Sequence, residues 1–199
     1  MRPKTLLEMA GVSPSPVRLS DAVVVVIDAQ HEYVDGALPL PGVGPALDQI
    51  GRLLERVRAA ELPVIHVVYH GSARGLFAPG SPGAEIAPPA APAPGEEVLS
   101  KRLPNAFAST DLADRVAALK RPGVILVGFM THMCVEATAR SAIDQGLKAT
   151  VIASATATRD LPDPLTGAIV PAAEVQRNAL AALSDRFATV VPTVDDIRD

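Results

Sequence analysis

Cys134 is the single cysteine of this 199-residue chain, and it follows an apolar run at 124–128 where a helix-like segment begins. A helix N-terminus exposes backbone N–H groups and a partial positive charge, which lower the pKa of a thiol and can bind an oxyanion. We therefore predict that Cys134 is a nucleophile with a lowered pKa. The alternative is a small buried hydrophobic side chain, since free cysteine is often buried.

Two charged residues that follow other predicted strands are candidate partners for this thiol. Asp28 closes the apolar run 22–27, and Lys101 follows a short predicted strand at 97–99. A carboxylate beside a thiol can act as its base, and a cation is then needed because two close anions raise each other's pKa. In the alternative interpretation, Asp28 caps a turn and Lys101 lies in solvent.

Predicted strands and helices alternate along the chain. This alternation indicates a parallel α/β sheet with helices on both faces, and right-handed crossovers favour a doubly wound, Rossmann-like sheet with strand order 3-2-1-4-5-6. The first and fourth strands are then neighbours, so Asp28 and Cys134 should meet at the carboxyl edge. The six predicted strands are 22–27, 63–69, 97–99, 124–128, 148–153 and 188–191, and the later helices are 111–119 after an N-cap at Thr110, 132–145, and 171–183.

A glycine- and proline-rich stretch at 71–95 separates the second and third predicted strands. Long loops without secondary structure are often functional, so this one is predicted to cover the site or to contact another subunit. Neither side of the loop has enough strands for its own sheet. We therefore predict one domain over residues 1–199, with its core at about 21–191.

Composition excludes several classes of partner. The net charge is −4 without a cluster of Lys and Arg, which argues against nucleic-acid binding. The N-terminus lacks a sustained apolar segment, and no apolar stretch approaches the roughly 18–20 residues of a membrane helix. A single cysteine suits a reducing compartment, so we expect a cytoplasmic protein. The mean hydropathy of +0.26 is compatible with buried subunit surface.

Three motifs in order resemble the isochorismatase-like cysteine hydrolases over about 21–191. They are the strand end at Asp28, the segment 100–112 with Lys101, and the segment 128–139 with Cys134. The resemblance implies a catalytic triad of these three residues. It also implies a cis peptide bond between Phe129 and Met130, and an oxyanion hole formed by the backbone N–H groups of Met130 and Cys134.

The resemblance also narrows the chemistry. Isochorismatases proper cleave a vinyl ether and lack the cysteine, whereas Cys134 favours hydrolysis of a C–N bond through a thioester. The stretch 128–135 is similar to that of streptothricin hydrolases, so the predicted substrate is a small amide or lactam, with an N-carbamoyl amide as the alternative. Nicotinamidases carry an Asp-x-His metal motif after the second strand, where this chain has only His70. We therefore expect neither a metal nor another cofactor.

Four residues beside the triad are predicted to bind substrate, although ordinary core packing is an alternative for the two aromatic ones. Family members are usually homo-oligomers, so a dimer or tetramer is expected. Two other functional classes stay open at this point: a thiol redox protein cycling through sulfenic acid, and a catalytically idle, oligomeric interaction protein. The predicted substrate-binding residues are Gln30, Tyr33, Phe107 and His132.

Overall fold

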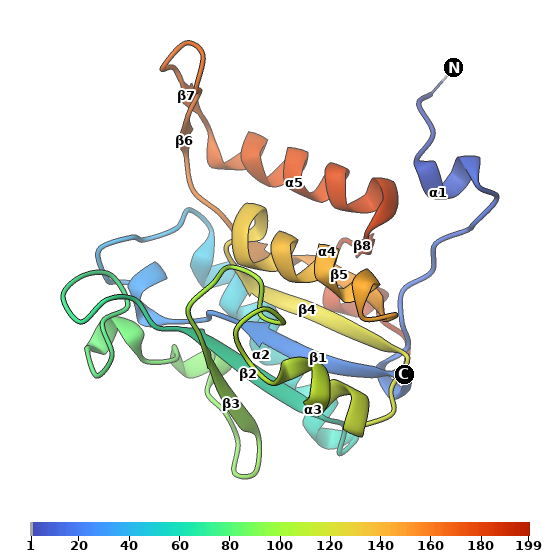
Figure 1. Cartoon of the computed structure of the whole chain (residues 1–199), viewed down its shortest axis with the longest axis horizontal. Coiled ribbons are helices and arrows are strands. Elements are labelled where there is room, and N and C mark those ends of the chain that lie inside the picture. Colours follow the sequence, from blue (N-terminus) through green and yellow to red (C-terminus); the bar gives the residue numbers. More distant parts are fainter. Residues whose placement is uncertain (1) are drawn as a thin grey trace.

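A six-stranded parallel sheet forms the centre of the computed structural model, which describes residues 2–199 (Figure 1). The order is β3-β2-β1-β4-β5-β8, so the predicted doubly wound sheet with order 3-2-1-4-5-6 is confirmed, β8 being the sixth strand of this sheet. The strands are β1 (Ala22–Ile27), β2 (Val64–Tyr69), β3 (Glu97–Lys101), β4 (Gly123–Phe129), β5 (Lys148–Ala157) and β8 (Thr189–Val191).

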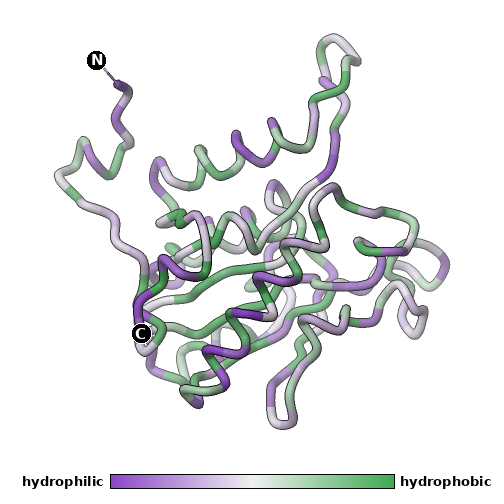
Figure 2. The backbone as a smooth tube through the Cα atoms, turned by 180° about the vertical axis from the view of Figure 1, so that it is seen from behind, coloured by the Kyte–Doolittle hydropathy of each residue, from purple (hydrophilic) through white to green (hydrophobic). Residues whose placement is uncertain are grey.

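Helices cover both faces of the sheet because its central strands are apolar on both sides. Alternate residues of β1 enter two separate hydrophobic cores, one with α2 (Val43–Ala59) and the other with α3 (Leu112–Ala118), α4 (Glu136–Asp144) and α5 (Ala172–Arg186). Figure 2 shows hydrophobic residues concentrated along the central strands and mixed with hydrophilic ones along the helices. The short helix α1 (Leu6–Met9) packs on α5. Within residues 2–199, no helix combines the length and apolarity needed to span a bilayer.

Several element boundaries differ from the sequence predictions. Strand β3 continues to Lys101, so this residue ends the strand instead of following it. The predicted helix 132–145 begins as a π-helical turn, Thr131–Val135, before α4. Thr110 is not the N-cap of α3, because Asp111 occupies that position, although the Thr110 hydroxyl accepts the N–H of Leu112 at 3.0 Å. The hairpin of β6 (Leu161–Pro162) and β7 (Ile169–Val170) was not predicted, because two-residue strands show no periodicity.

The 71–95 stretch is an ordered loop held against the body of the protein. It contains two 3-10 turns, Pro82–Ala84 and Pro88–Ala90. An isolated bridge joins Gln30 to Ile86. This loop therefore lies beside the carboxyl end of β1, near the predicted site.

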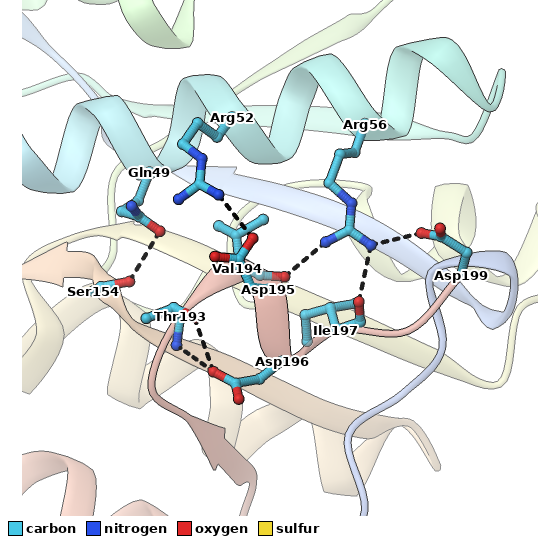
Figure 3. Close-up of polar contacts among 10 residues, drawn as sticks. All are labelled: Gln49, Arg52, Arg56, Ser154, Thr193, Val194, Asp195, Asp196, Ile197 and Asp199. Atoms are coloured by element: carbon cyan, nitrogen blue, oxygen red, sulfur yellow. Dashed lines mark hydrogen bonds and ion pairs between the residues drawn. The ribbon is translucent and has the colours of Figure 1, made fainter.

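Hydrogen bonds and ion pairs join the C-terminal segment to α2 (Figure 3). The Arg56 guanidinium donates to the backbone oxygens of Val194 and Ile197 at 2.7 and 2.9 Å. Arg52 lies 2.7 Å from the carboxylate of Asp195.

Candidate active site

The three predicted triad residues converge at the carboxyl edge of the sheet. The Lys101 Nζ lies 2.8 Å from Asp28 Oδ2 and donates a hydrogen bond to Cys134 Sγ at 3.2 Å. Asp28 and Lys101 are fully buried, and Cys134 is 4% exposed. The structure thus places an acid, a cation and a thiol in direct contact at the position that the strand order predicts.

Strand pairing explains this convergence. Strands β1 and β4 are hydrogen-bonded neighbours, so the residues that follow them lie side by side. Lys101 ends β3, two strands from β1, and its long side chain crosses the end of β2 with Nζ 5.1 Å from the ring centre of Tyr69. Only a long side chain bridges that gap.

Two unusual backbone conformations shape the turn after β1 and the end of β4. Asp28 has φ of 48°, a left-handed conformation that Asp tolerates better than most residues. Gly128 has φ of 112°, and a Cβ at this position would lie 1.9 Å from the Ile27 backbone oxygen. A glycine is therefore required for β1 and β4 to approach each other at the site.

The electrostatics of the triad favour a basic carboxylate held beside a permanent cation. Burial raises the pKa of Asp28, against the opposing charge of Lys101. Burial acts to lower the pKa of Lys101, but the charge of Asp28 and the thiol of Cys134 outweigh it and raise that pKa. Lys101 therefore stays protonated, and Asp28 accepts a proton more readily than an exposed aspartate does.

The expected low pKa of Cys134 is wrong. Burial and the Asp28 carboxylate raise the pKa of this thiol to about 12, although Lys101 acts in the opposite direction. The sequence argument considered only the helix terminus, whereas the thiol is removed from water and lies beside an anion. The resting group at neutral pH is consequently a thiol.

A pocket of about 570 Å³ opens onto Cys134. This volume falls within the usual range for small-molecule sites. The lining is largely apolar and aromatic, with Arg159 as its cationic residue, and it includes both Met130 and Cys134. The other lining residues are Tyr33, Leu38, Tyr69, Gly71, Ser72, Leu76, Phe77, Pro104 and Met133.

Of the four predicted substrate-binding residues, only Tyr33 lines this pocket. The amide of Gln30 is used inside the scaffold: its Nε2 donates to the backbone oxygens of Tyr69 and Ala84, and its Oε1 accepts the Tyr69 N–H. It therefore ties β1 to β2 and to the loop. Sequence position alone does not distinguish this role from substrate binding, because both place a polar residue after a strand.

Phe107 and His132 also lie outside the pocket lining. Phe107 packs against the core formed with α3, α4 and α5, as the alternative interpretation expected. The His132 Nδ1 makes a 2.5 Å hydrogen bond with the Thr158 hydroxyl. Burial and the nearby charge of Arg159 lower the pKa of His132, so this ring is mainly neutral at pH 7.

Sequence reasoning missed Tyr69, Phe77 and Arg159. Tyr69 ends β2, and Arg159 follows β5, so both lie at the same carboxyl edge as the triad. The rule that ligands bind beyond the carboxyl ends of parallel strands was a usable signal for both residues. Arg159 was missed because the fifth strand was predicted to end at 153, six residues before it, whereas β5 extends to Ala157. No sequence signal identified Phe77 within its irregular loop.

The peptide bond between Phe129 and Met130 is cis. The oxyanion-hole role of the Met130 and Cys134 N–H groups stays a prediction.

Within residues 2–199, no group of three or more His, Cys, Asp or Glu side chains is arranged to hold a metal ion. His66 is buried and pairs with Glu96.

A family model described as the isochorismatase domain matches residues 22–195. This chain belongs to the isochorismatase family. A crystal structure of an isochorismatase from Pseudomonas putida superposes with a TM-score of 0.92 at 38% identity, covering 98% of this chain and 99% of that one. The family resemblance seen in the three sequence motifs is therefore confirmed, and the protein is an isochorismatase-family hydrolase.

Three relatives differ in their named roles. The chain is 38% identical to the secreted isochorismatase effector Isc1 of Verticillium dahliae, over 94% of this chain and 96% of that protein. It is 34% identical to a streptothricin hydrolase of Streptomyces noursei, over 92% and 72% of the two chains. It is 32% identical to the maleamate amidohydrolase of Pseudomonas putida, over 65% and 68%. Because one relative is secreted, the cytoplasmic location stays a prediction, as does the homo-oligomer.

Proposed function

We propose that this hydrolase cleaves the C–N bond of a small amide that also carries a carboxylate, through a thioester at Cys134. The observation that carries the proposal is the buried contact of Asp28, Lys101 and Cys134, of which Cys134 lines a pocket of the size of a small-molecule site. A buried ion pair costs desolvation and is weak evidence for stability, whereas it suits a group that must move a proton.

In the proposed mechanism, Asp28 takes the proton of the Cys134 thiol as the sulfur attacks the amide carbon. Lys101 stays positive and stabilises the developing thiolate. The backbone N–H groups of Met130 and Cys134 stabilise the tetrahedral oxyanion. Asp28 then gives its proton to the leaving nitrogen, and the C–N bond breaks to leave a thioester.

Hydrolysis of the thioester repeats the same steps with water. Asp28 takes a proton from the water, whose oxygen adds to the thioester carbon. The C–S bond breaks, and the sulfur recovers a proton from Asp28. The products are a carboxylic acid and ammonia or an amine, and the enzyme returns to its starting state.

Arg159 supports the carboxylate part of the proposal. It is half-buried on the pocket wall, and its Nε is buried with no hydrogen-bond partner among residues 2–199. A guanidinium with free donors suits a carboxylate, which it can bind through two hydrogen bonds. Maleamate, the compound named for one relative, contains an amide and a carboxylate. Lactams and N-carbamoyl amides remain the alternatives that the experiment separates.

The redox alternative is disfavoured by the state of the thiol. Sulfenic-acid sensors need an exposed thiol with a low pKa. Cys134 is 4% exposed, and burial raises its pKa to about 12.

The test measures ammonia release from maleamate, from maleamide, in which a second amide replaces the carboxylate, and from an N-carbamoyl amino acid. Ring opening of a lactam, which releases no ammonia, is measured alongside by mass spectrometry. We expect maleamate to be preferred, and Arg159→Gln to reduce that preference by roughly 10- to 100-fold. The exposed Arg177→Gln is the control.

Cys134→Ala should abolish turnover in every case. Hydrolysis that survives Cys134→Ala would contradict the nucleophile. Faster turnover of the lactam would overturn the carboxylate assignment while leaving the nucleophile assignment in place. Faster turnover of the N-carbamoyl amino acid, which also carries a carboxylate, would replace the simple amide by a carbamoyl amide as the substrate.

A further inference from the structure

Phe77 occupies a backbone conformation that a bulky residue rarely adopts. Its φ is 56°, in the left-handed region, although its side chain is 97% buried, being only 3% exposed. Such a conformation costs free energy and persists only where the surroundings enforce it, which makes it a marker for functional positions. Phe77 lies in the 71–95 loop and lines the same pocket as Cys134.

The ring of Phe77 belongs to an aromatic cluster that lies against the triad. It meets Tyr33 edge-on with ring centres 4.9 Å apart and Tyr69 with ring centres 5.5 Å apart. Lys101 Nζ lies 5.1 Å from the Tyr69 ring centre. Burial and the nearby charges of Asp28 and Cys134 raise the pKa of Tyr33. The rings therefore form the part of the pocket wall next to the reacting group.

Glu32 holds Phe77 in this position. Its carboxylate is buried, at 6% exposure, and Oε2 accepts the N–H of Phe77 at 3.2 Å. The other oxygen, Oε1, accepts the N–H of Ala37 at 2.8 Å. One carboxylate thus joins the turn after β1 to the loop that carries Phe77.

Gly83 leaves the space that this carboxylate fills. A Cβ at Gly83 would lie 2.2 Å from Glu32 Oε2. Its backbone is not in the left-handed region, so the requirement for glycine comes from this contact. Alanine at position 83 would therefore displace the carboxylate without removing its charge.

We propose that Phe77 is a specificity-determining wall of the pocket and that Glu32 is the positioning residue that fixes it. A wall of rigid aromatic rings beside Cys134 admits small, flat acyl groups and excludes bulky ones. The inference rests on the proposed function because it takes Cys134 as the reacting group. Its test uses alkylation of the thiol and needs no hydrolytic turnover, so failure of one is distinguishable from failure of the other.

Because Cys134 is the single cysteine, alkylation can be followed by the mass of the intact protein. The two probes are iodoacetamide, which is small, and N-phenyliodoacetamide, which carries a bulky ring, both at pH 9. Both react with the same thiolate, so the ratio of their rates cancels any change in the pKa of Cys134. Each probe's rate is divided by its rate with a free thiol.

Phe77→Ala should lower the preference for the small probe by about tenfold, because the bulky probe gains access. Glu32→Gln and Gly83→Ala should also lower the preference for the small probe, by severalfold. Their iodoacetamide rates should stay near that of the wild type. The matched controls are Glu85→Gln, an exposed carboxylate of the same loop, and Gly44→Ala, where a Cβ meets nothing within 4 Å. Both controls should keep the wild-type ratio.

Every other outcome overturns part of the inference. An unchanged ratio of the two rates in Phe77→Ala would contradict the role of Phe77 as a specificity-determining wall. The ratio could instead fall in Phe77→Ala and stay unchanged in Glu32→Gln and Gly83→Ala. That result would contradict the role of Glu32 as the positioning residue. Equal acceleration of both probes in Glu32→Gln, with a lower melting temperature, would show that Glu32 supports the fold only. If Glu32→Gln does not fold, Gly83→Ala alone decides the point.

Discussion

The two ends of strand β3 each hold a carboxylate beside a cation, but the two groups have opposite pKa shifts. At the carboxyl end, Lys101 contacts Asp28, whose pKa is raised by burial. At the other end, Arg58 contacts Glu96, whose pKa is lowered to about 2 despite partial burial. Similar ion pairs at the two ends of one strand thus have different effects on the pKa of the carboxylate.

The difference lies in how deeply each carboxylate is buried and in the donors around it. Glu96 accepts two hydrogen bonds from Arg58, one from His66 and one from the backbone N–H of Ala93, all at 2.8 to 2.9 Å. These donors stabilise its charge and outweigh burial. Asp28 has Lys101 as its ion-pair partner and is fully buried. The hydrogen bonds to Glu96 keep that carboxylate charged, whereas full burial leaves Asp28 more ready to accept a proton.

Removing the cation from the carboxyl end should have the largest effect. Lys101→Met should lower amide turnover by roughly 10³-fold or more and destabilise the fold by about 3–5 kcal/mol, because it leaves a buried carboxylate without its counter-ion. Steady-state kinetics and urea unfolding measure the two effects. The double variant Asp28→Asn, Lys101→Met should regain most of the stability and stay inactive. Wild-type turnover in Lys101→Met would contradict the triad.

Glu96 should matter for stability and show a defined pH dependence. The pKa of Glu96 in the folded protein lies below its ordinary value of 4.5, at about 2. Its stabilising effect is therefore present in full above pH 4.5 and is lost as the pH falls toward 2. We expect Glu96→Gln to be less stable by about 3 kcal/mol at pH 7, with the gap closing between pH 4.5 and 2.

The control for this prediction is Glu97→Gln, at the exposed neighbouring carboxylate. Urea unfolding at several pH values gives the stability of each variant. A pH-independent gap between Glu96→Gln and the wild type would show that the carboxylate charge is not the stabilising feature.

Removing the charge of Asp28 should make the thiol more reactive toward alkylation while stopping catalysis. The carboxylate raises the pKa of Cys134, so Asp28→Asn should lower that pKa toward its ordinary value. Each unit by which the pKa of Cys134 falls gives a tenfold increase in the thiolate fraction. Iodoacetamide labelling at pH 8 should therefore accelerate by about tenfold or more. Asp144→Asn, an exposed change on α4, is the control. Slower labelling in Asp28→Asn would contradict this electrostatic interpretation.

The smallest effect is expected at the surface pairs of α2. Arg52 and Asp195 are 49% and 68% exposed, and exposed ion pairs contribute about 0–1 kcal/mol. Arg52→Ala should therefore change the free energy of unfolding by less than about 1 kcal/mol and leave turnover unchanged. A loss of stability in Arg52→Ala as large as that expected for Glu96→Gln would contradict this interpretation. It would mean that burial and the number of donors do not explain why the exposed pair and the Glu96 pair differ.

Local sequence patterns predicted the sheet and the location of the site. Short β-branched runs between helical segments led to the strand order, because strands buried on both faces are apolar throughout. The order then placed Asp28 and Cys134 at one edge. The predicted strand ends were less accurate: β5 extends to Ala157, and with it Arg159 moves to the pocket.

By itself, the sequence determined which residue types end the strands, and therefore which three side chains meet at the carboxyl edge. The tertiary structure alone decided their protonation and their surroundings. The pKa of Cys134 depends on how completely water is excluded and on the distance to Asp28, and neither quantity follows from local pattern. Phe77 reaches the pocket through an irregular loop that Glu32 holds across 45 positions of sequence, a contact that exists only once the chain has folded.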